Sequence, residues 1–102
     1  MRKAFSKTKP ECKVTFKIPA DILAGAKKAA VAGEFNNWNP EANPVRIVKG
    51  EGSVSIPLET GQSYQYKFIV DNDRWENDPD ADSYIANEFG EANSIVKCVK
   101  KK

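Results

Sequence analysis

Hydrophobic and polar residues alternate along several short stretches of the chain, the pattern of strands with one buried and one solvated face. In residues 12–18 (CKVTFKI) every second residue is apolar, and Pro19 ends the run. Residues 63–70 (SYQYKFIV) show the strongest alternation, with aromatic residues on one face. Lys67 falls on the opposite face, so we expect it to point away from the core.

The remaining β-rich runs are short and separated by turn residues. They cover residues 28–33, 45–49, 53–58, 74–76 and 94–99. Gly50-Glu51-Gly52 is a hairpin signal between two of these runs. About seven antiparallel strands, with no sustained 3.6-residue period, predict an all-β, immunoglobulin-like β-sandwich without a helix longer than one or two turns.

A chain of 102 residues has room for one domain, whose core buries about two-thirds of the surface that the unfolded chain exposes. The chain contains no histidine, which excludes Ser-His-Asp and Cys-His catalysis, histidine-ligated zinc and histidine proton shuttles. Carboxylate, Lys, Tyr or Cys chemistry is what remains as a basis for an enzyme, so the sequence favours a non-catalytic protein. We expect no catalytic residue and no cofactor.

The formal net charge of +2 combines two opposite regions. Eight of the 16 Lys and Arg residues lie in 1–9 and 97–102, which leaves eight cations against all 14 acids elsewhere, a net charge of −6. An acidic body repels phosphates, so no nucleic-acid partner is expected. We divide the chain into a basic, flexible N-terminal segment (1–11), a β-sandwich module (12–99) and a basic C-terminal tail (100–102), with ends that serve solubility.

No apolar stretch of signal-peptide length opens the chain, and no run approaches the length of a membrane span. We therefore expect a cytoplasmic protein without a membrane partner. Cys12 and Cys98 lack CxxC spacing, and in a reducing compartment we expect both to be free, buried thiols. A disulfide between them requires the first and last strands to be neighbours.

Two tryptophans lie in turn regions outside the predicted core. Residues 33–40 (GEFNNWNP) place Trp38 in a sharp corner, because Asn tolerates left-handed backbone geometry. The corner either holds Trp38 outward or lets it fold back as a lid on the core. Trp75 follows a second polar turn, eight residues after Lys67. Two tryptophans with a lysine between them indicate a platform rather than a core.

A platform of this composition suits a sugar ligand. The C–H face of a pyranose stacks on an indole, and its hydroxyls pair with Lys, Asn and Asp side chains. The acidic residues from 71 to 82 fit a calcium loop poorly, because Ser83 and Phe89 stand where the loop needs Gly and Glu. We therefore predict no metal site and interpret Asp78-Pro79-Asp80 as a turn.

Four ordered segments carry a resemblance to a known family: residues 31–38 (VAGEFNNW), residues 66–71 (YKFIVD), Trp75 with Asp78-Pro79, and residues 90–94 (GEANS). Together they resemble carbohydrate-binding module family 48, the glycogen- and starch-binding module found beside isoamylases and branching enzymes. The chain is similar also to the module in the β subunits of AMP-activated protein kinase. The resemblance implies an early-set sandwich that binds α-1,4-linked glucans without catalysis.

The resemblance also implies roles for individual residues. Trp38 and Trp75 stack on successive glucose rings, and Lys67 and Asn93 hydrogen-bond ring hydroxyls. Phe89 stands where glycogen binders present an apolar residue that inserts into the ring of a curved glucan chain. The expected partners are an α-glucan polysaccharide or oligosaccharide and, as a candidate, an amylolytic enzyme. The alternative is a domain of the same fold that docks onto an amylolytic enzyme or kinase without binding sugar.

Overall fold

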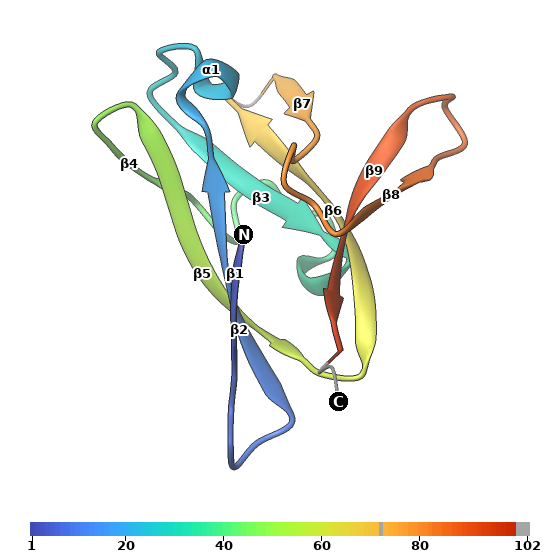
Figure 1. Cartoon of the computed structure of the whole chain (residues 1–102). Helices are drawn as coiled ribbons and strands as arrows, with labels where there is room; N and C mark the ends of the chain where they lie inside the picture. Colours follow the sequence, from blue (N-terminus) through green and yellow to red (C-terminus); the bar gives the residue numbers. More distant parts are fainter. Residues whose placement is uncertain (72, 100–102) are drawn as a thin grey trace.

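This computed structural model describes residues 1–71 and 73–99. Two antiparallel sheets face each other across the core (Figure 1), and together they contain the nine strands of the described residues. Sheet A has the order β1 (Arg2–Phe5), β2 (Glu11–Ile18), β5 (Glu51–Glu59), β4 (Arg46–Val48). Sheet B has the order β3 (Ala29–Gly33), β6 (Gln62–Val70), β9 (Ala92–Cys98), β8 (Ser83–Ala86), and β7 (Arg74–Glu76) pairs with β6. The predicted all-β sandwich is confirmed, with nine strands where the turn signals indicate about seven.

The core between the sheets follows from the alternation of the sequence. On β2 every second residue from Cys12 to Ile18 is buried. On β6 the aromatic face points toward β2, and the rings of Phe16 and Tyr66 pack edge to face with their centroids 4.9 Å apart. Edge-to-face packing is a favoured geometry for two aromatic rings and adds to the energy of burial.

Short turns connect the strands. Pro19 ends β2 and caps α1 (Ala20–Leu23), a single turn whose Leu23 is buried in the core. The β4–β5 hairpin turns at Lys49 and Gly50, with φ angles of 53° and 81°. Two central residues with positive φ match the twist of a two-residue hairpin, so the turn is shorter than the predicted turn at residues 50–52. Helices in the described part of the chain are limited to α1 and η1 (Glu34–Asn36), and neither is long and apolar enough to cross a membrane.

The N-terminal segment is more ordered than expected. Its composition predicts that residues 1–11 are flexible, whereas Arg2–Phe5 forms strand β1. This strand pairs with β2 from Arg2 opposite Thr15 to Phe5 opposite Cys12. Phe5 packs against the core, and the ammonium of Lys3 forms an ion pair with Asp82 of the β7–β8 loop. Backbone pairing and one apolar anchor thus order a segment whose composition is that of a tail. The predicted C-terminal tail, 100–102, lies outside the described residues.

Cys12 on β2 and Cys98 on β9 come from different sheets and meet in the core. Both are fully buried and free, as predicted. Burial raises the pKa of both thiols, that of Cys98 to about 11. Because the thiolate is the reactive form, both cysteines are held in an unreactive state.

Candidate carbohydrate-binding face

Three of the predicted site residues share the outer face of sheet B. Lys67 on β6 lies opposite Ala32 of β3, and Trp75 on β7 lies opposite Ile69 of β6. Tyr66 of β6 pairs with Ser94 of β9. The next positions along these antiparallel strands are Lys67 and Asn93, so Asn93 lies beside Lys67 on the same face. Side chains opposite each other in an antiparallel pair point to the same side of the sheet. The fold therefore brings together residues 26 positions apart in sequence.

Trp38 lies in the loop that leaves the end of β3, and this loop is built around Asn36. The side-chain Oδ1 of Asn36 accepts the backbone N–H of Gly33 at 3.0 Å, and its side-chain Nδ2 donates to the backbone carbonyl of Val31 at 2.9 Å. Asn37 and Trp38 then adopt left-handed backbone, with φ of 57° and 58°, and the Trp38 N–H donates back to the Gly33 carbonyl at 2.9 Å. The indole is half-buried. The corner predicted from the Asn residues is present, and it fixes the backbone of Trp38 beside the end of β3.

Close packing ties this loop to β6. A Cβ on Gly33 would lie 2.5 Å from the carbonyl oxygen of Gln65, so only glycine fits at the end of β3. One residue later, the carboxylate of Glu34 accepts the Gln65 N–H at 2.7 Å. Gln65 lies just beyond the last β3–β6 pair, Gly33 with Tyr66, so the Glu34 side chain supplies its N–H with an acceptor. The position of Trp38 is therefore coupled to the strand that carries Lys67.

Trp75 lies in the three-residue strand β7, and its side chain is 44% exposed. The preceding residue, Arg74, holds this strand in place. Its guanidinium donates to the carbonyls of Ile22 and Leu23 at 3.2 and 3.4 Å, and to the carboxylate of Glu76 at 3.2 Å. Because α1 is anchored in the core by Leu23, Arg74 connects the strand that bears Trp75 to a rigid part of the fold.

Lys67 is unusual for an outward-facing cation because it is only 7% exposed. Its ammonium lies 4.0 Å from a carboxylate oxygen of Glu91, too far for a hydrogen bond. The residue directly opposite on β3 is Ala32, which has no polar side-chain group to pair with the ammonium. A desolvated ammonium with a loose partner retains the capacity to donate hydrogen bonds to a ligand.

Asn93 is oriented by a row of side-chain amides across sheet B. The Asn87 amide donates to the Asn93 carbonyl at 3.2 Å, and the Asn93 amide donates to the Gln65 carbonyl at 3.0 Å. Each bond uses one polar position of Asn93, which leaves one N–H and one lone pair for another partner. Gln65 belongs to the same face, and sequence reasoning missed its role because its partners lie on a distant strand.

Phe89 lies at the tip of the β8–β9 hairpin, which projects from the body of the sandwich (Figure 1). Its side chain is 78% exposed. The side-chain Oδ1 of Asn87 accepts the backbone N–H groups of Phe89 and Glu91 at 3.0 and 3.1 Å, and Gly90 has a φ of 78°. The tip is therefore an ordered turn that presents an apolar ring. Ile85, opposite Asn93 on β8, is also exposed and extends the face in a way that the sequence did not indicate.

Asp78 faces the interior and does not belong to this site. It is 1% exposed, accepts a hydrogen bond from the Tyr66 hydroxyl at 2.6 Å, and accepts the Asp80 N–H at 2.8 Å. The predicted turn at 78–80 is thus present, but the buried bond to Tyr66 is a structural role that the sequence did not reveal. Burial raises the pKa of Asp78. Within the described ranges, no group of three or more acidic or cysteine side chains converges as a metal site would require.

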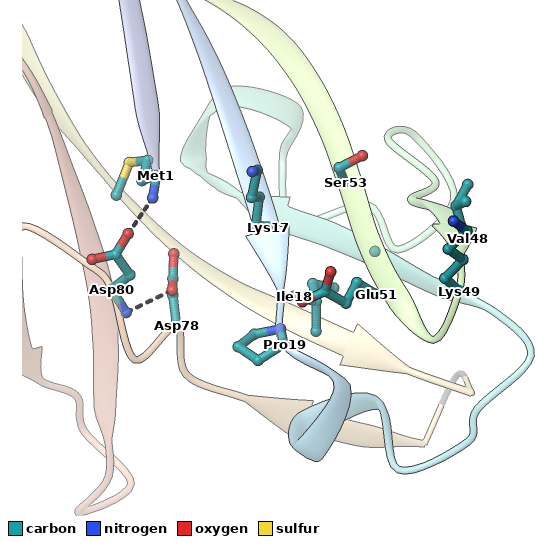
Figure 2. A pocket seen from close by; sticks show the side chains of 11 residues that line it. Met1, Lys17, Ile18, Pro19, Val48, Lys49, Glu51, Ser53, Asp78 and Asp80 are labelled. Carbon is teal, nitrogen blue, oxygen red and sulfur yellow. Dashed lines mark hydrogen bonds and ion pairs between the residues drawn. The ribbon is translucent and has the colours of Figure 1, made fainter.

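A cavity of about 530 Å³ lies elsewhere, at the end of β2 and the β4–β5 hairpin. Figure 2 shows Met1 and Asp80 on one side of it and Val48 and Lys49 on the other. None of the five predicted site residues lines this cavity. The cavity and the predicted site are therefore separate features of the molecule.

Comparison with known families agrees with the geometry. Residues 21–102 match the family described as "Glycogen recognition site of AMP-activated protein kinase". The match covers most of the chain, and the protein belongs to this family of carbohydrate-recognition domains. The family resemblance seen in the sequence is thereby confirmed. No curated protein sequence matches the chain.

Among solved structures, the chain is similar to part of a maltogenic amylase from S. marinus. The two superpose with a TM-score of 0.59 and 24% sequence identity over 90% of this chain. The match spans only 14% of the amylase, so it concerns one domain of a much larger enzyme. At this identity the likeness shows the shared fold.

Proposed function

We propose that the protein binds α-1,4-linked glucans such as glycogen, starch and maltooligosaccharides, without catalysing a reaction. The observation that carries this proposal is the grouping of Trp75, Lys67 and Asn93 on one outward face of sheet B. Trp38 lies in the loop that follows β3, the strand paired with β6. Membership in a glycogen-recognition family supports it.

The two tryptophans supply the apolar part of the contact. An indole covers the C–H face of a glucose ring and contributes about 1 kcal/mol beyond the area that it buries. Trp75 is open to solvent on the sheet face, and its backbone is held by Arg74. Trp38 is less exposed and enters from the loop after β3. Successive glucose rings would stack on these two side chains.

Polar groups between the tryptophans set the orientation of the chain of sugars. The Lys67 ammonium donates to ring hydroxyls, and the remaining N–H and lone pair of Asn93 pair with a hydroxyl of the same glucan. The amide row from Asn87 to Gln65 holds Asn93 in position before the ligand arrives. Preorganised polar groups bind with a smaller loss of side-chain entropy.

Phe89 completes the platform from the hairpin tip. Its ring is the most exposed large apolar side chain in the described part of the molecule. The Glu91 carboxylate, in the same turn as Phe89, lies near Lys67, which places this turn beside the polar centre of the face. We propose that a curved glucan chain accepts the Phe89 ring on its inner side, whereas a flat glucan does not.

An open platform buries little area, so we expect a dissociation constant on the order of 10 to 500 μM for a linear maltooligosaccharide. The expected biological partner is an amylolytic enzyme, since domains of this fold occur inside such an enzyme. We further propose that the protein acts in the cytoplasm, where its two thiols stay reduced.

Nuclear magnetic resonance titration with maltoheptaose tests the proposal. We expect shifts on β6, β7 and β9, no shifts with a β-1,4-linked cello-oligosaccharide, and at least about tenfold weaker binding for Trp75→Ala. Val48→Ala is the matched control, because Val48 is an exposed apolar residue on sheet A.

Two results would contradict glucan binding: maltoheptaose causes no shifts, or the protein migrates unretarded through a native gel that contains glycogen. If Trp38→Ala and Trp75→Ala then disrupt a complex with an enzyme or kinase, the face is a protein-docking surface instead. The 44% exposure of Trp75 favours the sugar, because a scaffold residue is expected beneath loops.

A further inference from the structure

Four cations gather on the outer face of sheet A, on the side of the sandwich away from the proposed glucan site. Lys13 and Lys17 alternate with buried residues of β2, so both point outward and are exposed. The registers of β1 and β4 place Arg2 and Arg46 on the same face, and both are exposed. We call Arg2, Lys13, Lys17 and Arg46 the basic quartet.

Small neutral residues separate the members of the basic quartet. Thr15 and Ser55 lie in the centre of the face, and their hydroxyl oxygens are 2.9 Å apart. Ser53 lies between Lys17 and Arg46, and Pro57 lies beside Lys13. Within the described residues, the strand registers place no acidic or aromatic side chain between the four cations. From strand spacing, the quartet spans about 14 by 13 Å.

The two halves of the sandwich carry opposite charge. Residues 1–19 and 44–60, which form sheet A and its turns, contain eight Lys or Arg and three Glu. Residues 20–43 and 61–99, which form sheet B and its loops, contain five Lys or Arg and eleven Asp or Glu. Composition alone predicts that the N-terminal cations form a solubilising end, whereas β1 brings Arg2 onto the same face as Lys13 and Lys17.

We propose that the basic quartet docks an acidic protein surface. A flat four-stranded face with concentrated positive charge attracts and orients a partner of opposite charge. Acidic residues bound the quartet at both ends: Glu51 beyond Lys17, and the paired Glu11 and Glu59 beyond Lys13. These carboxylates repel a continuous polyanion that extends past the quartet. They leave room for a protein surface whose acidic residues are confined to a patch of the quartet's size.

Nucleic acid and anionic membranes fit the same face less well. Among the described residues that the strand registers place on this face, none is an aromatic on which a base could stack, as single-stranded nucleic-acid sites require. The acidic half of the molecule lies within the reach of a long polyanion and opposes its approach. A compact acidic patch avoids both problems, because it contacts only sheet A.

This arrangement separates docking from sugar binding. The two sheets of a sandwich lie about 10 Å apart, and their outer faces point in opposite directions. A protein bound to the basic quartet therefore leaves Trp75, Lys67 and Asn93 open. A partner enzyme could be held on one side of the domain while the other side contacts a ligand.

Fluorescence anisotropy with a labelled peptide of alternating Glu and Ser tests this proposal. A DNA duplex and phosphatidylserine vesicles serve as competing probes. We expect the peptide to bind, to weaken steeply between about 50 and about 300 mM salt, and to lose at least about tenfold in affinity for the double variant Lys17→Glu/Arg46→Glu.

The matched control is Lys27→Glu/Lys28→Glu, which changes the net charge equally at two exposed lysines outside sheet A. We expect it to lose less than about twofold, since its charges lie off the face. Equal losses for both variants, tighter binding of the duplex or vesicles than of the peptide, or no peptide binding at low salt would each overturn the proposal. Thermal melts confirm that both variants fold, and the result is independent of glucan binding.

Discussion

Outward-facing side chains behave differently on the two sheets. On sheet A, β2 alternates strictly, and Lys13 and Lys17 reach solvent. On sheet B, the last five residues of β6 are all buried, including the outward-facing Lys67 and Ile69. The short strand β7 pairs with this part of β6, and Glu91 of the β8–β9 turn lies near Lys67. An outward direction therefore does not decide by itself whether a lysine reaches solvent, since Lys67 is buried whereas Lys13 and Lys17 are exposed.

The largest expected effect concerns the buried side-chain hydrogen bond between Tyr66 of sheet B and Asp78. Asp78→Ala leaves the Tyr66 hydroxyl and the Asp80 N–H without their acceptor. We expect the free energy of unfolding to fall by about 2 to 4 kcal/mol, because both groups are buried or partly buried. Urea denaturation measures the change.

Thr15→Ala is the control on sheet A, since it removes an exposed hydroxyl contact to Ser55. We expect a loss below about 1 kcal/mol. If the two variants are destabilised equally, the buried bond of Asp78 has no special importance for stability.

The next effect compares two lysines in glucan affinity. Lys67→Met keeps the length of the side chain but removes the ammonium, and we expect roughly tenfold weaker binding of maltoheptaose, since hydrogen bonds to charged groups contribute about 1.5 to 3 kcal/mol. Lys13→Met on sheet A should leave the affinity unchanged. Isothermal titration calorimetry provides both values. Unchanged affinity for Lys67→Met would remove Lys67 from the site.

A smaller effect is expected for the arginine that positions Trp75. Arg74→Ala removes the bonds to the carbonyls of Ile22 and Leu23, so β7 gains mobility. We expect roughly three- to fivefold weaker maltoheptaose binding and a change in Trp75 fluorescence, with partial recovery in Arg74→Lys. Arg46→Ala on sheet A is the control. A loss of stability without a change in affinity would show that Arg74 has only a structural role.

The smallest effect is a pH dependence of stability. Burial raises the pKa of Asp78, with the hydrogen bond from Tyr66 opposing the shift. The native carboxyl therefore binds its proton more tightly than the unfolded one. Its contribution to the free energy of unfolding is greatest below the unfolded pKa and decreases as pH rises toward the native pKa.

Asp80 has the opposite sign, because a hydrogen bond from the N-terminal ammonium lowers its pKa. Its stabilising contribution is lost as pH falls. Comparison with Asp78→Asn cancels this opposing term, since Asp80 is present in both proteins. We expect the stability of the wild type relative to Asp78→Asn to decrease between about pH 3 and pH 7. A constant or increasing difference in urea unfolding would contradict the raised pKa.

Strands with strict alternation were predictable, because the period of two is a local property. The run at 12–18 became β2, and the run at 63–70 became β6 with Lys67 outward. The strands β1 and β8 were missed for one reason: neither shows clear alternation, and each is ordered by pairing with a distant segment. Pairing supplies backbone hydrogen bonds that no local pattern records.

The candidate site was predictable in its residues but not in its architecture. Trp38, Trp75 and Lys67 stood out because a core did not need them, and the family resemblance added Asn93 and Phe89. The support around them depends on contacts between distant segments: Asn93 with Gln65, and Arg74 with the end of α1. Sequence spacing carries no information on such partners.

The sequence by itself determined the sandwich class, the outward position of Lys67 and the family to which the domain belongs, because alternation, turn residues and short motifs are written locally. Only the tertiary structure decided that Lys67 is buried, that Asp78 bonds Tyr66 inside the core, and that Arg2 joins a basic face rather than a tail. Burial and charge grouping arise when two sheets close on each other, and neither exists before the distant strands meet.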